Sequence, residues 1–310
     1  MHTDQPATNV SRTRFGELSF LRYRAHGWDG WVLEPWSGFD GFADLDAWLS
    51  DRGCQEPVLE VPCRTITRAA TPLGTVYAKR MRAQNDGVLR KNELFSKFKW
   101  MFYPSRGRGI VRCTAAMLSL GHNCPVPVLG LRRRHGLRLP EDLLVATELT
   151  DPTVEERLRE SAGDGAARAA ILETCGRELA ALHADRFIHG DFLPRNVCLS
   201  RDGATFSFLD NDRTHHWPCP PPFHFLRRNL TQFCFNLWLA AESPVPDEAD
   251  TFISAYAAAA GWDDRRTQAE RRRIHQANAL RWNKTARWEL KRKRQLAAAA
   301  ESGAAGTPTP

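Results

Sequence analysis

Two short stretches of this chain concentrate the side chains that can do chemistry. The first reads Ile188-His189-Gly190-Asp191-Phe192-Leu193-Pro194-Arg195-Asn196, and the second reads Phe206-Ser207-Phe208-Leu209-Asp210-Asn211-Asp212-Arg213. Asp191 and Asn196 stand five residues apart, and Asp210 follows Asp191 by 19 residues. Apolar residues border each of these polar groups. The spacing therefore predicts a loop, a short hairpin and a second loop.

The residue types suit phosphoryl transfer, because that reaction needs positioning and charge neutralisation rather than covalent help. Asp191 would orient an acceptor hydroxyl and take its proton. Asn196 and Asp210 would hold Mg²⁺ against the phosphates, since hard cations prefer oxygen ligands. Protein kinases carry the same groups as H-R-D-x4-N, followed by a metal-binding aspartate. The alternative is a polar turn between two strands, which three such groups at this spacing disfavour.

A lysine is expected to contact the α- and β-phosphates of the nucleotide. Lys79 ends an apolar strand over residues 74–81 and resembles the lysine of the kinase V-A-I-K strand. The alternative is an exposed strand lysine. No glycine lies between Pro62 and Gly74, so the glycine-rich phosphate loop of protein kinases is missing. A hairpin over residues 64–68 is expected to contact phosphate through side chains instead.

The apolar spacing of residues 109–120 predicts the αC helix that follows the lysine strand in kinases. That helix carries a glutamate for the lysine in kinases, but residues 94–140 contain no acid and nine basic residues. Glu93 lies too early to substitute well. Either a different acid positions Lys79, or activity is weakened. The basic surplus would meet an anionic substrate or form a solvated face.

The predicted fold class is α+β, with two lobes as in protein kinases. An antiparallel sheet with one αC helix would form the N-lobe, and the C-lobe would be mainly helical. The predicted parts are an N-terminal lead-in packed on the N-lobe (1–60), the N-lobe (61–150), the C-lobe (151–296) and a disordered tail (297–310). The strand ending at Glu148 would meet adenine through backbone groups. A long helix over residues 166–186 leads to His189, and His183 at its end is expected to cap carbonyls.

Composition indicates a globular protein with an anionic partner. Apolar residues make up 42% and charged residues 25%, with a net charge of +7 and a pI near 9.1. No apolar run is long enough to span a membrane. Eight scattered cysteines without a C-x-x-C pair predict reduced thiols and a cytoplasmic location. Residues 265–294 carry twelve basic residues with Trp282 and Trp288 interleaved, which is typical of a helix on an anionic bilayer or of a solvated face.

These residues together resemble the lipopolysaccharide kinase family, whose members phosphorylate heptose or Kdo sugars of the lipid A core. The resemblance covers about residues 64–240. It rests on these segments: Arg64-Thr65-Ile66-Thr67-Arg68, Tyr77-Ala78-Lys79-Arg80, Gly121 with Pro125-Val126-Pro127, His189-Gly190-Asp191 with Arg195-Asn196, and Leu209-Asp210-Asn211-Asp212-Arg213. The family's metal motif reads I-D-F-D-R, and this chain has Asn211 in place of the phenylalanine.

The resemblance implies an ATP-dependent kinase with Mg²⁺ that phosphorylates a sugar hydroxyl of a lipopolysaccharide core or similar glycolipid, at a site peripheral to the inner membrane. It implies these roles: Asp191 as base, Asn196 and Asp210 as metal ligands, Lys79 and Glu148 in nucleotide binding, and Asp212 and His189 in support. Two alternatives stay open: a nucleotide-binding pseudokinase that acts as a scaffold, and a small-molecule kinase of the aminoglycoside or choline type. The hypothesis that the chain is a nucleic-acid-binding module rests on net charge alone and is disfavoured.

Overall fold

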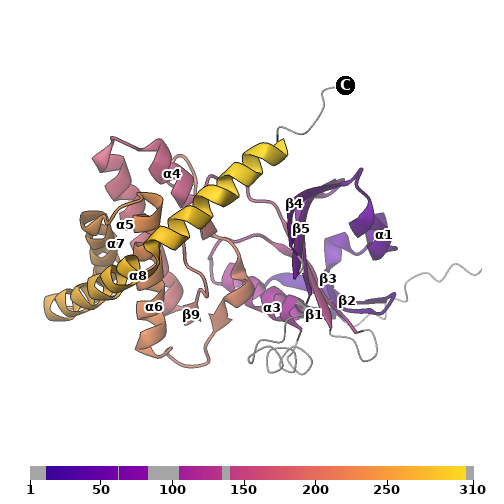
Figure 1. Cartoon of the computed structure of the whole chain (residues 1–310). Helices are drawn as coiled ribbons and strands as arrows, with labels where there is room; N and C mark the ends of the chain where they lie inside the picture. Colours follow the sequence, from indigo (N-terminus) through magenta and orange to yellow (C-terminus); the bar gives the residue numbers. More distant parts are fainter. Residues whose placement is uncertain (1–11, 62, 83–104, 135–139, 305–310) are drawn as a thin grey trace, which may run out of the picture. The chain divides into compact units, whose positions relative to one another are not determined.

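The computed structural model describes residues 12–61, 63–82, 105–134 and 140–304, which form two compact units (Figure 1). The first unit comprises Met1–Thr150 and Ser207–Thr214, and the second comprises Asp151–Phe206 and His215–Pro310. The chain thus divides after Thr150. The segment Ser207–Thr214 belongs to the first unit, although the sequence-based division placed it in the C-lobe.

An eight-stranded antiparallel sheet forms the first unit, in the order β1-β2-β3-β7-β8-β6-β5-β4. The strands are β1 (Arg12–Phe15), β2 (Leu18–Ala25), β3 (Trp28–Leu33), β4 (Gln55–Val61), β5 (Arg64–Thr71), β6 (Gly74–Arg82), β7 (Pro127–Arg133) and β8 (Glu141–Thr147). Four of them, namely β1, β2, β3 and all but the last residue of β4, come from the segment predicted as a lead-in packed on the lobe. That prediction is wrong, because β1, β2 and β3 extend the same sheet through the β3–β7 pairing.

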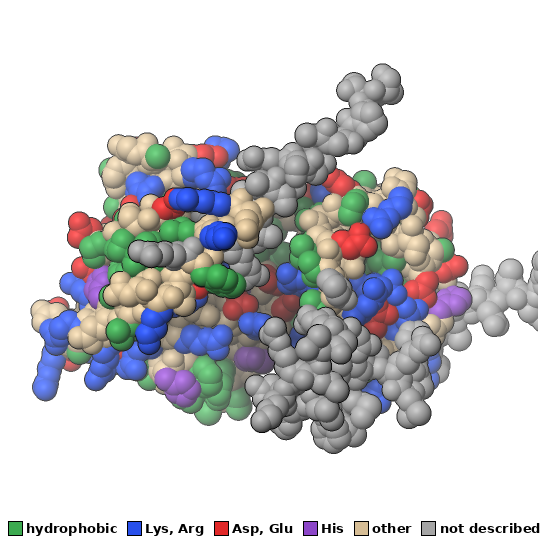
Figure 2. All heavy atoms as spheres, viewed as in Figure 1, with side chains coloured by type: hydrophobic (Ala, Val, Ile, Leu, Met, Phe, Trp, Pro, Cys, Tyr) green, Lys and Arg blue, Asp and Glu red, His purple; other side chains and the backbone are tan. Residues whose placement is uncertain are grey.

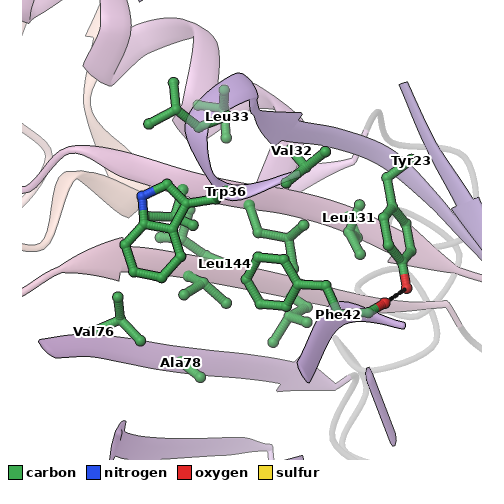
Figure 3. Close-up of a cluster of buried hydrophobic side chains, with 14 of the residues drawn as sticks. Tyr23, Val32, Leu33, Trp36, Phe42, Val76, Ala78, Leu131 and Leu144 are labelled. Carbon is green, nitrogen blue, oxygen red and sulfur yellow. Dashed lines mark hydrogen bonds between the residues drawn. The ribbon is translucent and has the colours of Figure 1, made fainter. Parts of the chain in front are cut away.

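An aromatic layer covers one face of this sheet (Figure 3). It comes from the short helices η1 (Glu34–Trp36), η2 (Asp40–Phe42) and α1 (Leu45–Ser50). Trp36 and Phe42 lie over Val76 and Ala78 of β6, and the Tyr23 hydroxyl donates to the Phe42 carbonyl oxygen at 2.8 Å. Because strand side chains alternate between faces, Lys79 points to the opposite side from Ala78.

The helix α3 (Arg106–Ser119) covers that opposite face. It approaches the sheet closely at Gly107 and Gly130: a Cβ on Gly130 would lie 2.7 Å from the Gly107 carbonyl oxygen. Gly130, Leu144 and Lys79 follow one another across the strand register. The face that α3 covers is therefore also the face that carries Lys79.

The second unit is mainly helical. Its helices are α4 (Val154–Glu160), α5 (Gly165–Ala184), α6 (Phe223–Ala240), α7 (Pro246–Ala259) and α8 (Asp264–Ala304), with the 3-10 turn η3 (Pro194–Asn196). Its short strands are β9 (Phe187–Ile188), β10 (Val197–Leu199) and β12 (His215–His216), and β9 pairs with β12. Gly176 lets α5 approach α7, since a Cβ there would lie 2.6 Å from the Phe252 carbonyl oxygen. Among the described residues, no helix is both long and apolar enough to cross a membrane.

The helix α8 continues to Ala304, so the prediction of a disordered tail from residue 297 is wrong for residues 297–304. The run of alanines from Ala297 to Ala300 explains the difference, because alanine has the highest intrinsic helix propensity. The last six residues of the predicted tail, and Glu93, lie outside the described residues.

Local contacts explain why Ser207–Thr214 belongs to the first unit. This segment holds the end of β11 (Phe206–Phe208) and the 3-10 turn η4 (Asn211–Arg213). The Phe208 amide donates to the Asn123 carbonyl oxygen at 2.8 Å, and the His122 ring meets the Phe208 ring edge-on at 5.9 Å. The turn η4 packs against α3. The second acidic motif therefore packs on α3 and on the residues that follow it.

Candidate active site

Lys79 is the centre of a charged cluster in the first unit. Its Nζ lies 2.6 Å from Asp210 Oδ1, and it also pairs with the carboxylate of Asp212. Lys79 is only 8% exposed. A lysine this buried requires a charged partner. The alternative of a solvated strand lysine is therefore excluded.

The backbone at Asp210 brings both carboxylates to the same ammonium. Asp210 has a left-handed conformation, with φ 50° and ψ 52°, directly before η4. This region is uncommon for residues other than glycine, although aspartate tolerates it. Burial raises the pKa of the Asp212 carboxyl. Lys79 opposes this rise, and the adjacent Asp210 adds to it.

The acids that position Lys79 come from η4 and from the residue directly before it, rather than from α3. The helix α3 contains no acidic residue, and it lies where the glutamate-bearing helix was expected. Asp210 and Asp212 both reach the ammonium instead. Of the two alternatives drawn from the sequence, the structure thus supports the one in which a different acid positions Lys79.

The same two carboxylates suit a magnesium ion in type and number. Mg²⁺ is usually held by one or two carboxylates, with waters and substrate phosphates completing its shell. Asp210 and Asp212 would supply two oxygen ligands of this kind, and the Asp210 side chain is 34% exposed. Within the described parts of the chain, no group of three or more His, Cys, Asp or Glu side chains is arranged to hold a metal on its own.

Strand β5 adds arginines to the face that carries Lys79. Residues 64–68, expected as a hairpin, lie in β5, and Ile66 pairs with Lys79 in the strand register. Arg64 and Arg68 are two residues away on either side and share that face. Arg68 binds Glu148 with Nε 2.7 Å from Oε1, and also pairs with Glu56. Arg64 begins β5 directly after the β4–β5 turn, and its charge, like that of Lys79, opposes the rise in the pKa of Asp212.

Glu148 follows β8, at the position expected to meet adenine through its backbone. Its amide N–H donates to the Thr75 carbonyl oxygen at 2.9 Å and is therefore already engaged. Its side chain accepts from Arg68 and from the Tyr77 hydroxyl, and these bonds hold the pKa of the Glu148 carboxyl below its ordinary value. A role in nucleotide binding remains a prediction for Glu148.

The second unit holds the other predicted groups, which share one loop. The Asn196 side-chain amide donates to the Asp191 carbonyl oxygen at 2.9 Å, and the Asp191 N–H donates to His189 Nδ1 at 3.3 Å. These bonds fold the loop between β9 and β10 on itself. His189 is fully buried, and a supporting role remains a prediction for it.

Two buried residues of the second unit were missed or misread in the sequence. His183 was expected to cap helix carbonyls, but that expectation is wrong. It is buried, and its ring binds Tyr256 and Asn229. The sequence patterns did not single out Asn229. It is fully buried and donates to the His189 carbonyl oxygen. An asparagine within the apolar run of α6 was the signal available in the sequence.

Comparison with known proteins gives a match at the level of structure only. No family model matches the chain, and no curated protein matches its sequence. The structure of WaaP in complex with acyl carrier protein superposes with a TM-score of 0.55 at 16% identity, covering 81% of this chain and 95% of that one. The bifunctional kinase-methyltransferase WbdD gives a TM-score of 0.41 at 17% identity, covering 83% of this chain and 54% of that one, which is too loose to bear on the fold. The chain shares the fold of WaaP, and this confirms the two-lobe, kinase-like α+β fold predicted from its motifs and its family resemblance.

Proposed function

We propose that the protein transfers the γ-phosphoryl group of ATP to a sugar hydroxyl of a lipopolysaccharide core or similar glycolipid. The observation that carries the proposal is the buried Lys79 held by Asp210 and Asp212. A phosphate-binding lysine beside a metal-binding acid is what phosphoryl transfer requires. The resemblance of its motifs to the lipopolysaccharide kinase family supports the choice of acceptor, and the chain shares its fold with WaaP.

Each residue has a defined role in this proposal. Lys79 binds the α- and β-phosphates, and Arg64 contacts phosphate where kinases use glycine-rich backbone. By the family resemblance, Asp210 and Asn196 would hold a magnesium ion, and Asp212 would support Lys79, with which it pairs. The ion would neutralise the charge that develops on the transferred group. Asp191 orients the acceptor hydroxyl and takes its proton.

We propose that one face of α8 contacts a membrane. The outer face of α8 is formed by Arg273, Leu280, Lys284, Trp288 and Lys291, which recur at helical spacing. Leu280 and Trp288 are each 62% exposed. In contrast, Trp282 packs inward against Phe235 and Trp238. Lys and Arg side chains are visible at several points along α8 in Figure 2.

This combination fits an anionic bilayer, where a tryptophan sits at the headgroup level and basic residues meet anionic lipids. We therefore place the protein in the cytoplasm, peripheral to the inner membrane. The eight free cysteines support the cytoplasmic location. Sedimentation with vesicles tests the surface: Trp288→Ser and Lys284→Glu should each weaken binding to vesicles containing phosphatidylglycerol. Arg201→Glu, which changes an exposed arginine away from α8, is the control. Equal binding of all three variants and the wild type would refute this surface.

The pseudokinase alternative keeps one supporting observation, namely that α3 lacks a glutamate for Lys79. The pairing of Lys79 with Asp210 and Asp212 weighs against it, because the lysine is positioned without that glutamate. A nucleotide-binding scaffold would need neither Asp191 nor a metal ligand for its task.

Paired substitutions separate these possibilities. Asp210→Asn should weaken Mg-ATP binding and turnover together, because it removes a charge facing the metal. Asp191→Asn should leave nucleotide affinity nearly unchanged while turnover falls by about 100-fold or more, as expected for a lost general base. Asp40→Asn, at an exposed aspartate of η2, is the control. Calorimetric titration with Mg-ATP and an ATP-consumption assay on a lipopolysaccharide acceptor provide the two readouts. Nucleotide binding that ignores both Mg²⁺ and Asp210→Asn, without turnover on any glycolipid, would leave only the scaffold.

A further inference from the structure

A chain of hydrogen bonds crosses the core of the second unit and ends on the loop that carries Asp191. The Tyr256 hydroxyl on α7 lies 2.8 Å from His183 Nδ1 on α5. His183 Nε2 lies 3.0 Å from Asn229 Oδ1 on α6. The Asn229 side-chain amide then donates to the carbonyl oxygen of His189. All four residues are buried, so water does not compete for these bonds.

The donors and acceptors available in these groups allow only one direction of donation along this series of hydrogen bonds. The His189 carbonyl oxygen can only accept, so the Asn229 amide nitrogen donates to it and the Asn229 oxygen faces His183. His183 must then carry its proton on Nε2, which leaves Nδ1 to accept from the Tyr256 hydroxyl. Every polar atom that takes part is satisfied in this arrangement. Reversing any one bond would leave a buried group without a partner, which is costly.

An aromatic stack also joins the loop to α6 and α7, two of the three helices that the hydrogen-bond chain connects. Phe192 of the loop packs on Phe233 of α6 at 5.1 Å and on Phe252 of α7 at 6.4 Å. Phe233 lies four residues after Asn229, and Phe252 lies four residues before Tyr256. Residues four apart share a helix face. On α6, and likewise on α7, one helix face therefore carries both a residue of the hydrogen-bond chain and a phenylalanine that packs against Phe192 of the loop.

The local bonds of the loop do not by themselves fix its place on the helices. Asp191 to His189 and Asn196 to Asp191 are bonds within the loop, and they set only its own shape. The bond from Asn229 connects the loop backbone to α6, and through His183 and Tyr256 to α5 and α7.

We propose that Asn229 is a positioning residue that fixes the backbone at His189 and thereby the place of the Asp191 carboxylate, with His183 and Tyr256 holding its amide in orientation. The inference rests on the proposed function for the task of Asp191. Asn229 itself touches no reacting group, and it acts through the loop. A misplaced base slows turnover strongly even when the nucleotide still binds.

Two substitutions interrupt the series of hydrogen bonds at different points, and each changes the shape of the side chain very little. Asn229→Asp removes the donor to the His189 carbonyl oxygen, and Tyr256→Phe removes the donor to His183. Leu230→Val is the matched control, because Leu230 is the next residue of α6 and is fully buried but apolar. Should Asn229→Asp fail to fold because it buries a charge, Tyr256→Phe still tests the chain.

Hydrogen exchange of the loop amides gives a readout that needs no activity. In both chain-breaking variants, amides of residues 189–197 should exchange about 10-fold faster or more relative to those of α5, since a lost buried hydrogen bond has about this effect. Leu230→Val should change loop and helix amides together. Loop exchange that rises no more than helix exchange in Asn229→Asp and Tyr256→Phe would overturn the proposal.

Kinetics distinguish this proposal from the proposed function. Turnover should fall about 10-fold or more in both variants, with the Mg-ATP dissociation constant within about twofold of the wild type. If the loop exchanges faster in both variants but the wild type transfers no phosphoryl group, the anchoring is supported and the proposed function is refuted. Normal turnover in a variant whose loop exchanges faster would refute positioning by Asn229.

Discussion

The burial of His183 should make the stability of the second unit depend on pH. Burial lowers the pKa of His183 from 6.5 to about 4, and the neighbouring His189 adds to this effect, whereas the bond to Asn229 opposes it. The Tyr256 hydroxyl faces the other ring nitrogen. In the unfolded chain, His183 takes up a proton near pH 6.5, but in the folded chain it resists protonation down to about pH 4. The unfolded state therefore binds more protons across this window, and stability falls as the pH is lowered.

The size of the effect follows from the two pKa values. One pKa unit corresponds to about 1.4 kcal/mol, so acidification from pH 7 to pH 5 should lower the free energy of unfolding by about 2 kcal/mol through His183 alone. This stability is present above pH 6.5 and is lost progressively towards pH 4. The carboxylates that arginines hold, such as Glu141 with a pKa lowered to about 2, lose their contribution mainly below pH 4.5.

His183→Gln isolates the histidine, because glutamine offers a donor and an acceptor but does not titrate. Urea unfolding followed by tryptophan fluorescence at pH 7, 6 and 5 measures the free energy of unfolding of each protein. The difference between wild type and variant should shrink by about 2 kcal/mol between pH 7 and pH 5. His215→Gln is the control, since the His215 side chain is exposed. A difference that stays constant with pH would refute the argument that His183 is held neutral by burial.

Three further predictions concern the first unit. Arg132→Met should cost about 3–5 kcal/mol of unfolding free energy in urea titrations, because it leaves the fully buried carboxylate of Asp142 without its arginine; a cost below about 1 kcal/mol would contradict the pairing. Gly130→Ala should cost about 1–3 kcal/mol in the same assay, because its Cβ would overlap backbone atoms of α3. Gly38→Ala, where a Cβ meets nothing within 4 Å, should cost far less. Lys79→Met should raise the Mg-ATP dissociation constant by about 10-fold or more in calorimetry, and unchanged affinity would remove Lys79 from the phosphate site.

Much of the fold follows from local patterns that the sequence displays directly. The strand that carries Lys79 is recognisable from its β-branched and aromatic residues and its turn. The loop from His189 to Asn196 is recognisable from its spacing, because its hydrogen bonds join residues only two to five positions apart. Short-range features of this kind depend on neighbouring residues, and the sequence determines them by itself. The kinase-like fold could be predicted for the same reason.

The tertiary structure alone decided which groups meet across long stretches of chain. Lys79 and Asp210 are 131 residues apart, and the sequence, although it shows no glutamate in the helix, did not identify Asp210 or Asp212 as the partner of that lysine. The assignment of Ser207–Thr214 to the first unit depends on a backbone bond to Asn123. The roles of His183 and Asn229 depend on three helices packing together, since a polar residue in an apolar run shows that a partner is needed but not which one. Partner choice in a core is a property of the packed chain, because burial makes each polar group bond to whatever donor or acceptor the packing places beside it.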